Sequence, residues 1–445
     1  MTTSPQRSEL FDRVVAADKR HVWHPYTPMD RWIESTDPLV IVRAEGSRIE
    51  DVNGRRYLDA NSSWWVAPLG HNHPALVAAM REQADKFCHV SLAGITHEPA
   101  AMLAEELCAI APPGLTRVFY SDDGSTAVEA ALKMALQYWH NQGRSRKRRF
   151  LALDGAFHGD TLGAVSLGGV EVFRRPFAGV LLDCVHVPLP EAGEAAGAGH
   201  ERAFAALEQA LADGADEIAA LVLEPLLQGA AGMRVYDPEL VRRARAACDA
   251  HDVLLVADEV FTGYGRTGAM WASSLATVAP DLLCVAKGFT SGTVPMAATL
   301  CTNRIFDAFR GEPQRAFWHG HSYCGNPLGA AIARAVLQVY RDERICEQSR
   351  PRAARIAEAF EQLGRIPGVQ HPRALGMVAA VDLAAAPSYL GARGWRAYDH
   401  ARRLGAYLRP LGDVVYIAPP LNISDADLEE LLGIVRDSVV HALDV

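Results

Sequence analysis

Three short segments place polar side chains where apolar strands should end. Lys287 and Asp258 each close an otherwise apolar run, and Gly124-Ser125 follow a third such run and open a segment of helical periodicity. Open α/β sheets bind their ligands at the carboxyl ends of the strands. We therefore expect these side chains to meet in one crevice.

This set of groups suits the chemistry of a cofactor with an aldehyde, a ring nitrogen and a phosphate. The amine of Lys287 condenses with the aldehyde, the carboxylate of Asp258 keeps the ring nitrogen protonated, and the amides at the helix start bind the phosphate. A protonated ring accepts the electrons of the carbanion that forms when an amino acid loses its α-proton. A partly desolvated Lys287, once displaced by an incoming amine, can carry that proton. Taken alone, Lys287 could equally be a strand-end lysine that reaches solvent.

A dinucleotide-binding enzyme is the first competing class. The segment 263–268 matches the G-x-G-x-x-G pattern of NAD-dependent dehydrogenases, and Asp281 lies further along the chain. In that pattern the acid ends a strand, whereas Asp281 begins one, and Asp258 stands before the glycines, where it would repel a pyrophosphate. This alternative is disfavoured.

A metal enzyme is the second competing class. His71 and His73, and likewise His319 and His321, are spaced closely enough to bind a metal. Neither pair has the i, i+4 helical spacing or the nearby acidic ligand of a hydrolytic zinc site. We therefore expect no metal. A scaffold protein without activity fits least, because the polar strand ends would then be coincidental.

The elements that must position these groups alternate between strand and helix. Such alternation favours a mainly parallel α/β sheet with helices on both faces. Thr126 and Glu129 fit a capping box that opens the first helix, which should end near Gly143. Residues 60–336 are expected to form a large domain, and residues 1–59 and 337–445 a smaller second one. Strands are predicted at 117–121, 149–153, 219–224, 253–258 and 281–286.

The composition is that of a globular protein of two or three domains. The 445 residues are 49% hydrophobic and 22% charged, and 44 basic against 53 acidic residues give a net charge of −9. That charge disfavours nucleic acid and anionic lipid as partners, and the basic run 144–149 is interpreted as a solvated helix end. No run approaches the roughly 18 apolar residues of a membrane span, and the first residues hold no signal-peptide core. The eight cysteines show no C-x-x-C spacing, which favours reduced thiols in the cytoplasm.

Together, Lys287, Asp258-Glu-Val-Phe-Thr-Gly-Tyr-Gly-Arg-Thr-Gly and Glu224-Pro-Leu-Leu-Gln-Gly-Ala-Ala-Gly resemble the class III pyridoxal-phosphate aminotransferases. The resemblance implies pyridoxal 5'-phosphate as cofactor, fold type I, and a homodimer with active sites at the subunit interface. That fold has a large domain with a mainly parallel sheet flanked by helices, and a smaller α+β domain built from both termini.

Within the family, further segments resemble the members that convert 8-amino-7-oxononanoate to 7,8-diaminononanoate in biotin biosynthesis. The usual amino donor there is S-adenosyl-L-methionine. Lysine as donor, or another class III ω-aminotransferase reaction, is the alternative. The segments are 24–27, 62–65, 96–99, 133–139 and 408–410.

The resemblance also assigns roles to single residues. It implies that Phe157 stacks on the cofactor ring, that Arg409 pairs with the far carboxylate of the oxo acid, and that 320–322 reach the cofactor phosphate of the other subunit. The cofactor-binding residues would be Gly124, Ser125, Phe157, His158, Glu224, Asp258, Lys287, His321 and Ser322. The substrate-binding residues would be Tyr26, Trp64, Trp65, Phe157, Arg266, Lys287, Gly320 and Arg409.

Each substrate-binding residue has a structural alternative. Trp64 and Trp65 could pack in the core, Tyr26 could anchor a loop, and Arg409 could form a surface ion pair. Arg266 could instead form a salt bridge with Glu259 or Asp258.

Two departures from the family pattern leave the donor open. Members that use adenosylmethionine generally have a tyrosine where this chain has Phe157, and His-Gly-Pro-Thr where it has His319-Gly-His-Ser322. The segment His319-Gly-His-Ser322 is closer to lysine-using relatives and to class III enzymes at large. A lost phenol removes one hydrogen-bond donor, worth about 0.5–1.5 kcal/mol if it was paired.

Overall fold

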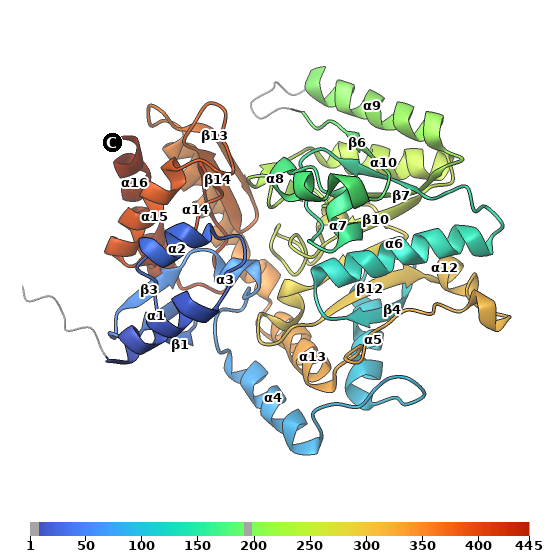
Figure 1. The fold of residues 1–445 in the computed structure, drawn as a ribbon, viewed down its shortest axis with the longest axis horizontal. Helices are drawn as coiled ribbons and strands as arrows, with labels where there is room; N and C mark the ends of the chain where they lie inside the picture. Colours follow the sequence, from blue (N-terminus) through green and yellow to red (C-terminus); the bar gives the residue numbers. More distant parts are fainter. Residues whose placement is uncertain (1–8, 191–197, 445) are drawn as a thin grey trace, which may run out of the picture.

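The chain divides into a larger part built on one wide sheet and a smaller part built from both termini (Figure 1). The structure is a computed structural model that describes residues 9–190 and 198–444. In Figure 1 the first and last segments of the chain, blue and red, lie side by side, and the central segments form the opposite half.

The wide sheet has seven strands, and only β12 (Ala297–Thr302) is antiparallel to its neighbours. The mainly parallel sheet predicted from the sequence is therefore confirmed, with β12 as an antiparallel strand that the alternation did not reveal. In spatial order the strands are β4 (Leu115–Ser121), β12 (Ala297–Thr302), β11 (Leu282–Val285), β10 (Leu254–Asp258), β7 (Ile218–Leu223), β5 (Arg149–Leu153) and β6 (Cys184–Val187).

Helices cover both faces of this sheet because alternate strand residues point to opposite sides. In β5, Phe150 and Ala152 pack with residues of α6, whereas Leu151 and Leu153 pack with residues of α9 and α10. Both faces are thus apolar and buried, as expected of a parallel sheet. The helices of this part are α3 (Ser62–Trp65), α4 (Pro74–Lys86), α5 (Glu98–Ile110), α6 (Gly124–Asn141), α7 (Leu162–Leu167), α8 (Glu171–Arg174), α9 (Ala198–Gly214), α10 (Pro238–Ala250), α11 (Ala272–Leu275), α12 (Asn303–Asp307) and α13 (Pro327–Asp342). Three 3-10 helices, η1 (Arg175–Val180), η2 (Lys287–Thr290) and η3 (Pro313–Arg315), and the hairpin of β8 (Leu227–Gln228) and β9 (Arg234–Val235) complete it.

The smaller part joins the two ends of the chain through a parallel strand pair, in which Leu58 of β3 lies opposite Ala406 of β15. One of its sheets has the order β1 (Ile41–Glu45), β2 (Arg48–Asp51), β3 (Arg56–Asp59) and β15 (Ala406–Tyr407). The other has the order β13 (Gln370–Leu375), β14 (Val378–Asp382) and β16 (Val414–Ile417). Its helices are α1 (Glu9–His21), α2 (Met29–Glu34), α14 (Ile345–Leu363), α15 (Arg393–Leu404) and α16 (Asp425–Leu443).

The domain limits expected from the sequence stay a prediction. Helix α13 runs through the limit between residues 336 and 337 and packs against α4 and α5. The helices of the described residues include none that is both long and apolar enough to cross a membrane.

One residue of the basic run is not solvated as expected. The Lys147 side chain is fully buried, and its amine donates to the carbonyl oxygens of Ile218 and Asp252 at 3.3 and 2.7 Å. It also lies 4.5 Å from the centre of the Trp139 ring. Burial lowers the pKa of Lys147 to about 8.

Candidate active site

The amino end of α6 is shaped to receive an anion. Asp123 caps the helix by accepting from the Thr126 amide at 2.9 Å, and the Thr126 hydroxyl accepts from the Asp123 amide at 3.0 Å. The capping box predicted at Thr126 and Glu129 is therefore wrong by one turn. Gly124 has no space for a side chain, because a Cβ would lie 2.6 Å from Val260. The first amides of α6 can therefore approach a phosphate closely.

A carboxylate is fixed at the end of β10. Asp258 Oδ1 accepts from the Val260 amide at 3.0 Å, and Oδ2 accepts from Nδ1 of His158 at 2.7 Å. Both side chains of this ion pair are buried. Burial disfavours the charged imidazole, but the hydrogen bond and the charge of Asp258 outweigh it and raise the pKa of His158. The pair holds the anion in one orientation.

Lys287 follows β11 at the same edge of the sheet. Its backbone is left-handed, with φ 49°, a conformation that is uncommon for non-glycine residues. The amine lies 4.6 Å from the centre of the Trp65 ring and 5.6 Å from that of Phe261. Within the part of the chain that the structure describes, Nζ has neither a hydrogen bond nor an ion pair. Burial lowers the pKa of Lys287 to about 8, against the opposing charges of Asp258 and Glu224, so a sizeable neutral fraction exists near neutral pH.

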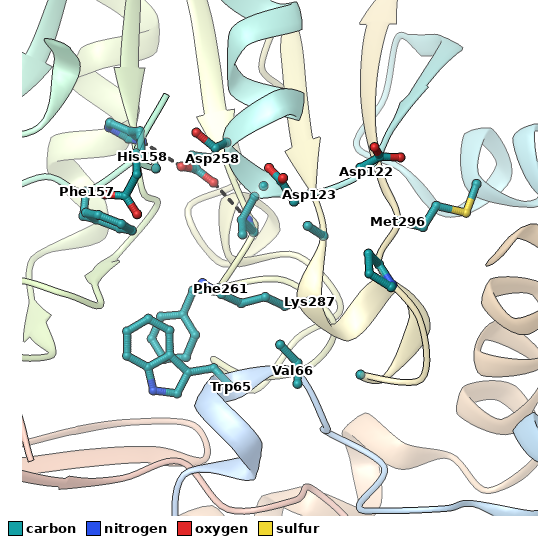
Figure 2. Close-up of a pocket in the computed structure, with 18 of the residues that line it drawn as sticks. Trp65, Val66, Asp122, Asp123, Phe157, His158, Asp258, Phe261, Lys287 and Met296 are labelled. Atoms are coloured by element: carbon teal, nitrogen blue, oxygen red, sulfur yellow. Dashed lines mark hydrogen bonds and ion pairs between the residues drawn. The ribbon is translucent and has the colours of Figure 1, made fainter. Parts of the chain in front are cut away.

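These groups face a common cavity of about 730 Å³. In Figure 2 Asp258 and His158 lie above Lys287, with Phe157 at the left and Trp65 at the lower left. The volume lies in the range of small-molecule sites. The sequence-predicted convergence of strand-end residues is therefore present in the structure.

Glu224 supports the wall that carries Phe157. Its carboxylate accepts from the amides of Phe157 and Gly229 at 3.0 and 2.9 Å. Burial raises the pKa of Glu224 to about 7, with Asp258 adding to the shift while His158 and the two amides oppose it. Glu224 thus acts on the cofactor cavity through the backbone that it holds.

The donor set of the cavity fits pyridoxal 5'-phosphate. It offers a half-buried amine that has no hydrogen-bond partner among the described residues, a carboxylate held in place, and helix-start amides at a glycine whose Cβ would collide. The residues that would hold the group are Lys287 at the aldehyde, Asp258 at the ring nitrogen, and Gly124 and Ser125 at the phosphate.

A second cavity, of about 860 Å³, adjoins the first and shares Tyr26 with it. Arg409 lies in its wall, with the guanidinium 4.5 Å from the centre of the Trp64 ring, and its amide donates to Asn61 Oδ1 at 2.7 Å. The Tyr26 hydroxyl donates to Asp160, and its ring meets Trp64 edge to face at 5.1 Å. One chain of contacts therefore leads away from the cofactor cavity, from Tyr26 through Trp64 to Arg409.

The structure does not bring every predicted residue to these cavities. Arg266 is fully buried, lines neither cavity, and donates to the Pro419 carbonyl at 2.6 Å. The salt bridge given as the structural alternative for Arg266 is wrong, because neither Glu259 nor Asp258 pairs with it among the described residues. Glu259 instead accepts from the amides of Ala272 and Ser273. Substrate binding by Arg266 stays a prediction.

The residues expected to act across a subunit interface are exposed. Gly320, His321 and Ser322 line neither cavity, and His321 Nδ1 lies 3.5 Å from Asp122. Their role in a second subunit stays a prediction.

Asp160 and Phe261 are among the residues of the cofactor cavity that were not predicted from the sequence. Asp160 lines the cofactor cavity and accepts from Tyr26, and its position two residues after His158 was an available signal. Phe261 packs on Trp65, with ring centres 4.5 Å apart, and lies within the segment that also holds Asp258. A single aspartate or phenylalanine in a sequence does not by itself indicate a role in a site.

The glycine segment and the histidine pairs, which suggested a dinucleotide-binding or a metal enzyme, have other roles in the structure. The segment 263–268 opens no helix, since α11 begins at Ala272. His71 pairs with Asp59 and His73 with Glu343, while His319 contacts Lys133. Residues 9–190 and 198–444 contain no group of three or more potential metal ligands.

The fold and the site define a pyridoxal-phosphate-dependent transaminase. The family model described as aminotransferase class-III matches residues 30–439, and the chain belongs to that family. Its substrates are small molecules.

Curated relatives match over nearly the whole chain. Two proteins named adenosylmethionine-8-amino-7-oxononanoate aminotransferase are among them. The one from Geobacter sulfurreducens is 41% identical, covering 95% of this chain and 96% of that protein, and the one from Synechococcus elongatus is 44% identical, covering 94% and 98%.

Solved structures also match over nearly the whole chain. The crystal structure of the protein of that name from Methanocaldococcus jannaschii superposes with a TM-score of 0.91 at 34% identity, covering 96% of this chain and 99% of the other. An amine transaminase from an uncultivated Pseudomonas species in its PLP-bound form gives 0.87 at 34% identity, covering 95% and 98%.

Replacing Gly159 with alanine is expected to weaken cofactor binding by about tenfold or more, because a 1 Å displacement of a binding group can cost about a hundredfold. Gly159 has φ 125°, and a Cβ would lie 2.3 Å from Ser125 Oγ, so Ser125 must move away from the phosphate position. The measurement is a titration of the cofactor-free protein with pyridoxal 5'-phosphate. Gly143→Ala is the matched control, since Gly143 also has positive φ but its Cβ would meet nothing within 4 Å. Equal affinities in both variants would contradict the assignment of Ser125.

Proposed function

We propose that this enzyme transfers an amino group onto 8-amino-7-oxononanoate to give 7,8-diaminononanoate, a step of biotin biosynthesis, with S-adenosyl-L-methionine as donor. The names and near full-length coverage of the curated relatives support this reaction. The observation that carries it in the structure is Arg409, held between indole rings on the far side of Tyr26 from Lys287. A guanidinium at that place suits a substrate with a carboxylate at the end of a long chain.

Arg409, Asp160 and Lys287 each have a separate role in the reaction. Arg409 binds the distant carboxylate and so orients the substrate chain along the second cavity. Asp160, paired with Tyr26, presents a negative group beside the cofactor cavity that suits a substrate amine. Bound pyridoxal 5'-phosphate supplies a ring that accepts electrons from the substrate carbon. Lys287 Nζ can take the proton from the amino-bearing carbon of the donor and, in the second half-reaction, deliver a proton to the carbon of the oxo acid that gains the amino group, since its lowered pKa leaves part of the amine neutral.

The amino donor is tested by a half-reaction. Purified holoenzyme is mixed separately with S-adenosyl-L-methionine, lysine and 1-phenylethylamine, and the loss of the cofactor absorption band is followed. The proposal expects adenosylmethionine to bleach the band fastest and 8-amino-7-oxononanoate to restore it. Bleaching by lysine would replace the donor but keep the biotin reaction. Bleaching by 1-phenylethylamine alone would favour an ω-transaminase, the class of a structural neighbour from Thermomicrobium roseum with TM-score 0.92 and 30% identity.

We further propose that the enzyme acts as a homodimer in the cytoplasm. Trp318 and Tyr323, which flank the segment 320–322, have 80% and 59% of their surface exposed. Large apolar side chains gathered at a surface favour burial by a partner. All eight cysteines are free, as is typical of a reducing compartment.

Arg409→Ala is expected to raise the KM for 8-amino-7-oxononanoate by about 10- to 150-fold, because hydrogen bonds to a charged group contribute about 1.5–3 kcal/mol. The KM for the amino donor should change much less, and steady-state kinetics with each substrate varied in turn measures both. Arg402→Ala is the control: Arg402 lines the same cavity but donates to the Asp37 carbonyl. Equal effects on both substrates would contradict the assignment of Arg409.

A further inference from the structure

The segment Ser62–Trp65, here called the 62–65 turn, is wound in the unfavoured direction. Its four residues have φ values of 47°, 47°, 65° and 75°, and none is glycine. In the left-handed region the Cβ atom crowds the following carbonyl oxygen, so runs of such residues are rare. The contacts around this turn must therefore hold it.

The turn carries two side chains to two different places. Trp65 lines the cofactor cavity with its ring beneath the amine of Lys287, whereas Trp64 lines the second cavity with its ring against the guanidinium of Arg409. The geometry of one short turn thus sets the surroundings of both cationic groups of the site.

The carboxylate of Asp59 holds the turn together with two longer-range contacts, from the Ser62 hydroxyl to the Ala418 carbonyl at 2.7 Å and from the Trp65 indole to the Tyr416 hydroxyl at 3.1 Å. Asp59 ends β3 and is buried with 2% of its surface exposed. Its oxygens accept from the amide and hydroxyl of Ser63 at 2.6 and 3.2 Å, from the amide of Asn61 at 3.1 Å, and from Nε2 of His71 at 2.9 Å. Asn61, oriented by this contact, in turn accepts from the amide of Arg409 at 2.7 Å.

We propose that Asp59 is a positioning residue for amino transfer: its carboxylate holds the 62–65 turn left-handed and thereby fixes both indole rings. Asp59 lines the second cavity, but it neither touches Lys287 nor pairs with Arg409, and it acts through the turn. The proposal rests on the transaminase class and not on the identity of the oxo acid.

A matched control lies in the same sheet. Asp51 is also buried, ends the neighbouring strand β2, and accepts from the amides of Asn53 and Arg55 and from the hydroxyl of Tyr57 at 2.9, 3.0 and 3.0 Å. Its turn carries no residue of either cavity. Asp51→Asn therefore reproduces the loss of a buried, turn-holding carboxylate without moving the site.

The experiment compares Asp59→Asn with Asp51→Asn and with the double variant Asp59→Asn/Ser63→Gly. Pyridoxal 5'-phosphate affinity is measured by quenching of tryptophan fluorescence. Steady-state kinetics give kcat and KM with the substrates that the unmodified enzyme accepts, and Tm reports the stability of each variant. Asp59→Asn is expected to weaken cofactor affinity and raise the KM of the carboxylate substrate, each by about ten- to a hundredfold, because a misplacement near 1 Å has that cost. Asp51→Asn should lower Tm and leave both values within about twofold.

The double variant tests whether Asp59 acts by holding the left-handed backbone of the 62–65 turn. Glycine adopts positive φ without the Cβ penalty, so Ser63→Gly should recover most of the affinity and of the KM even where Asp59→Asn alone folds poorly. A double variant as impaired as the single one, or an Asp51→Asn variant with the same kinetic losses, would overturn the proposal. Because cofactor affinity is measured without substrate, a failed assignment of the oxo acid leaves this result unaffected.

Discussion

Lys287→Ala is expected to lower kcat by about 10³- to 10⁴-fold while the protein still binds pyridoxal 5'-phosphate weakly. Positioned acid–base catalysis contributes about 10²- to 10⁴-fold, and Lys287 also holds the cofactor. The helix-start amides and Asp258 remain in the variant and should retain part of the affinity. Single-turnover kinetics and a cofactor titration measure the two effects.

A second lysine with a lowered pKa provides the control for this variant. Burial lowers the pKa of both Lys147 and Lys287 to about 8, but Lys147 donates to strand carbonyls away from the cavity. Lys147→Met should therefore lower Tm and leave kcat nearly unchanged. Borohydride reduction followed by peptide mapping should tag Lys287 in the unmodified enzyme, and a tag on Lys147 or on no lysine would refute the assignment.

The pH dependence of Lys287 follows from its shifted pKa. A pKa lowered to about 8 means that the neutral amine increases as pH rises and is the main form above that value. In the cofactor-free protein, acylation of Lys287 should therefore rise about tenfold per pH unit below the pKa and level off above it. Without the burial that causes the shift, the rise would continue to about pH 10.4.

Asp258→Asn is expected to lower kcat by about 10²- to 10³-fold, the usual loss when one oriented electrostatic group is removed from a reacting centre. The amide has nearly the shape of the carboxylate but no charge to keep a ring nitrogen protonated. Cofactor affinity should fall less than kcat, because the phosphate contacts persist. Pre-steady-state kinetics of the half-reaction and a cofactor titration separate the two quantities.

Asp281→Asn controls for the loss of a buried carboxylate in the same sheet. Asp281 stands before β11, at the edge opposite to the cavity, and accepts from Arg245 at 2.8 Å and from Arg304 at 3.0 Å. Its replacement should lower Tm through the lost ion pairs and spare kcat. A comparable loss of kcat in both variants would show that Asp258 acts through stability alone.

The sequence predicted those parts of the fold and site that local patterns determine. Apolar runs bounded by polar ends located the strands, and Lys287 and Asp258 were found because each ends such a run. The helix start was placed correctly to within one turn, but Asp123 rather than Thr126 caps it, since both residue types are good caps and the local sequence does not distinguish them.

Features that depend on distant parts of the chain could not be predicted in this way. Lys147 is buried because the carbonyls of Ile218 and Asp252 come to it, and no local pattern distinguishes it from its exposed neighbours. The left-handed conformation of the 62–65 turn runs against the preferences of serine and tryptophan, at a cost of about 1–2 kcal/mol for each residue. Some of the contacts that hold it come from distant residues: the Ser62 hydroxyl donates to the Ala418 carbonyl, and the Trp65 indole donates to the Tyr416 hydroxyl.

The parallel pairing of β3 with β15 also bears on how the enzyme is made. Leu58 cannot pair until the ribosome has added Ala406, 348 residues later. Long-range pairings of this kind close late and slowly. The lining of the cofactor cavity extends no further than Met296, whereas the second cavity needs residues up to Tyr416. A nascent chain would thus complete its cofactor residues well before those that recognise the oxo acid, and a prematurely released fragment would lack the arginine for the substrate carboxylate.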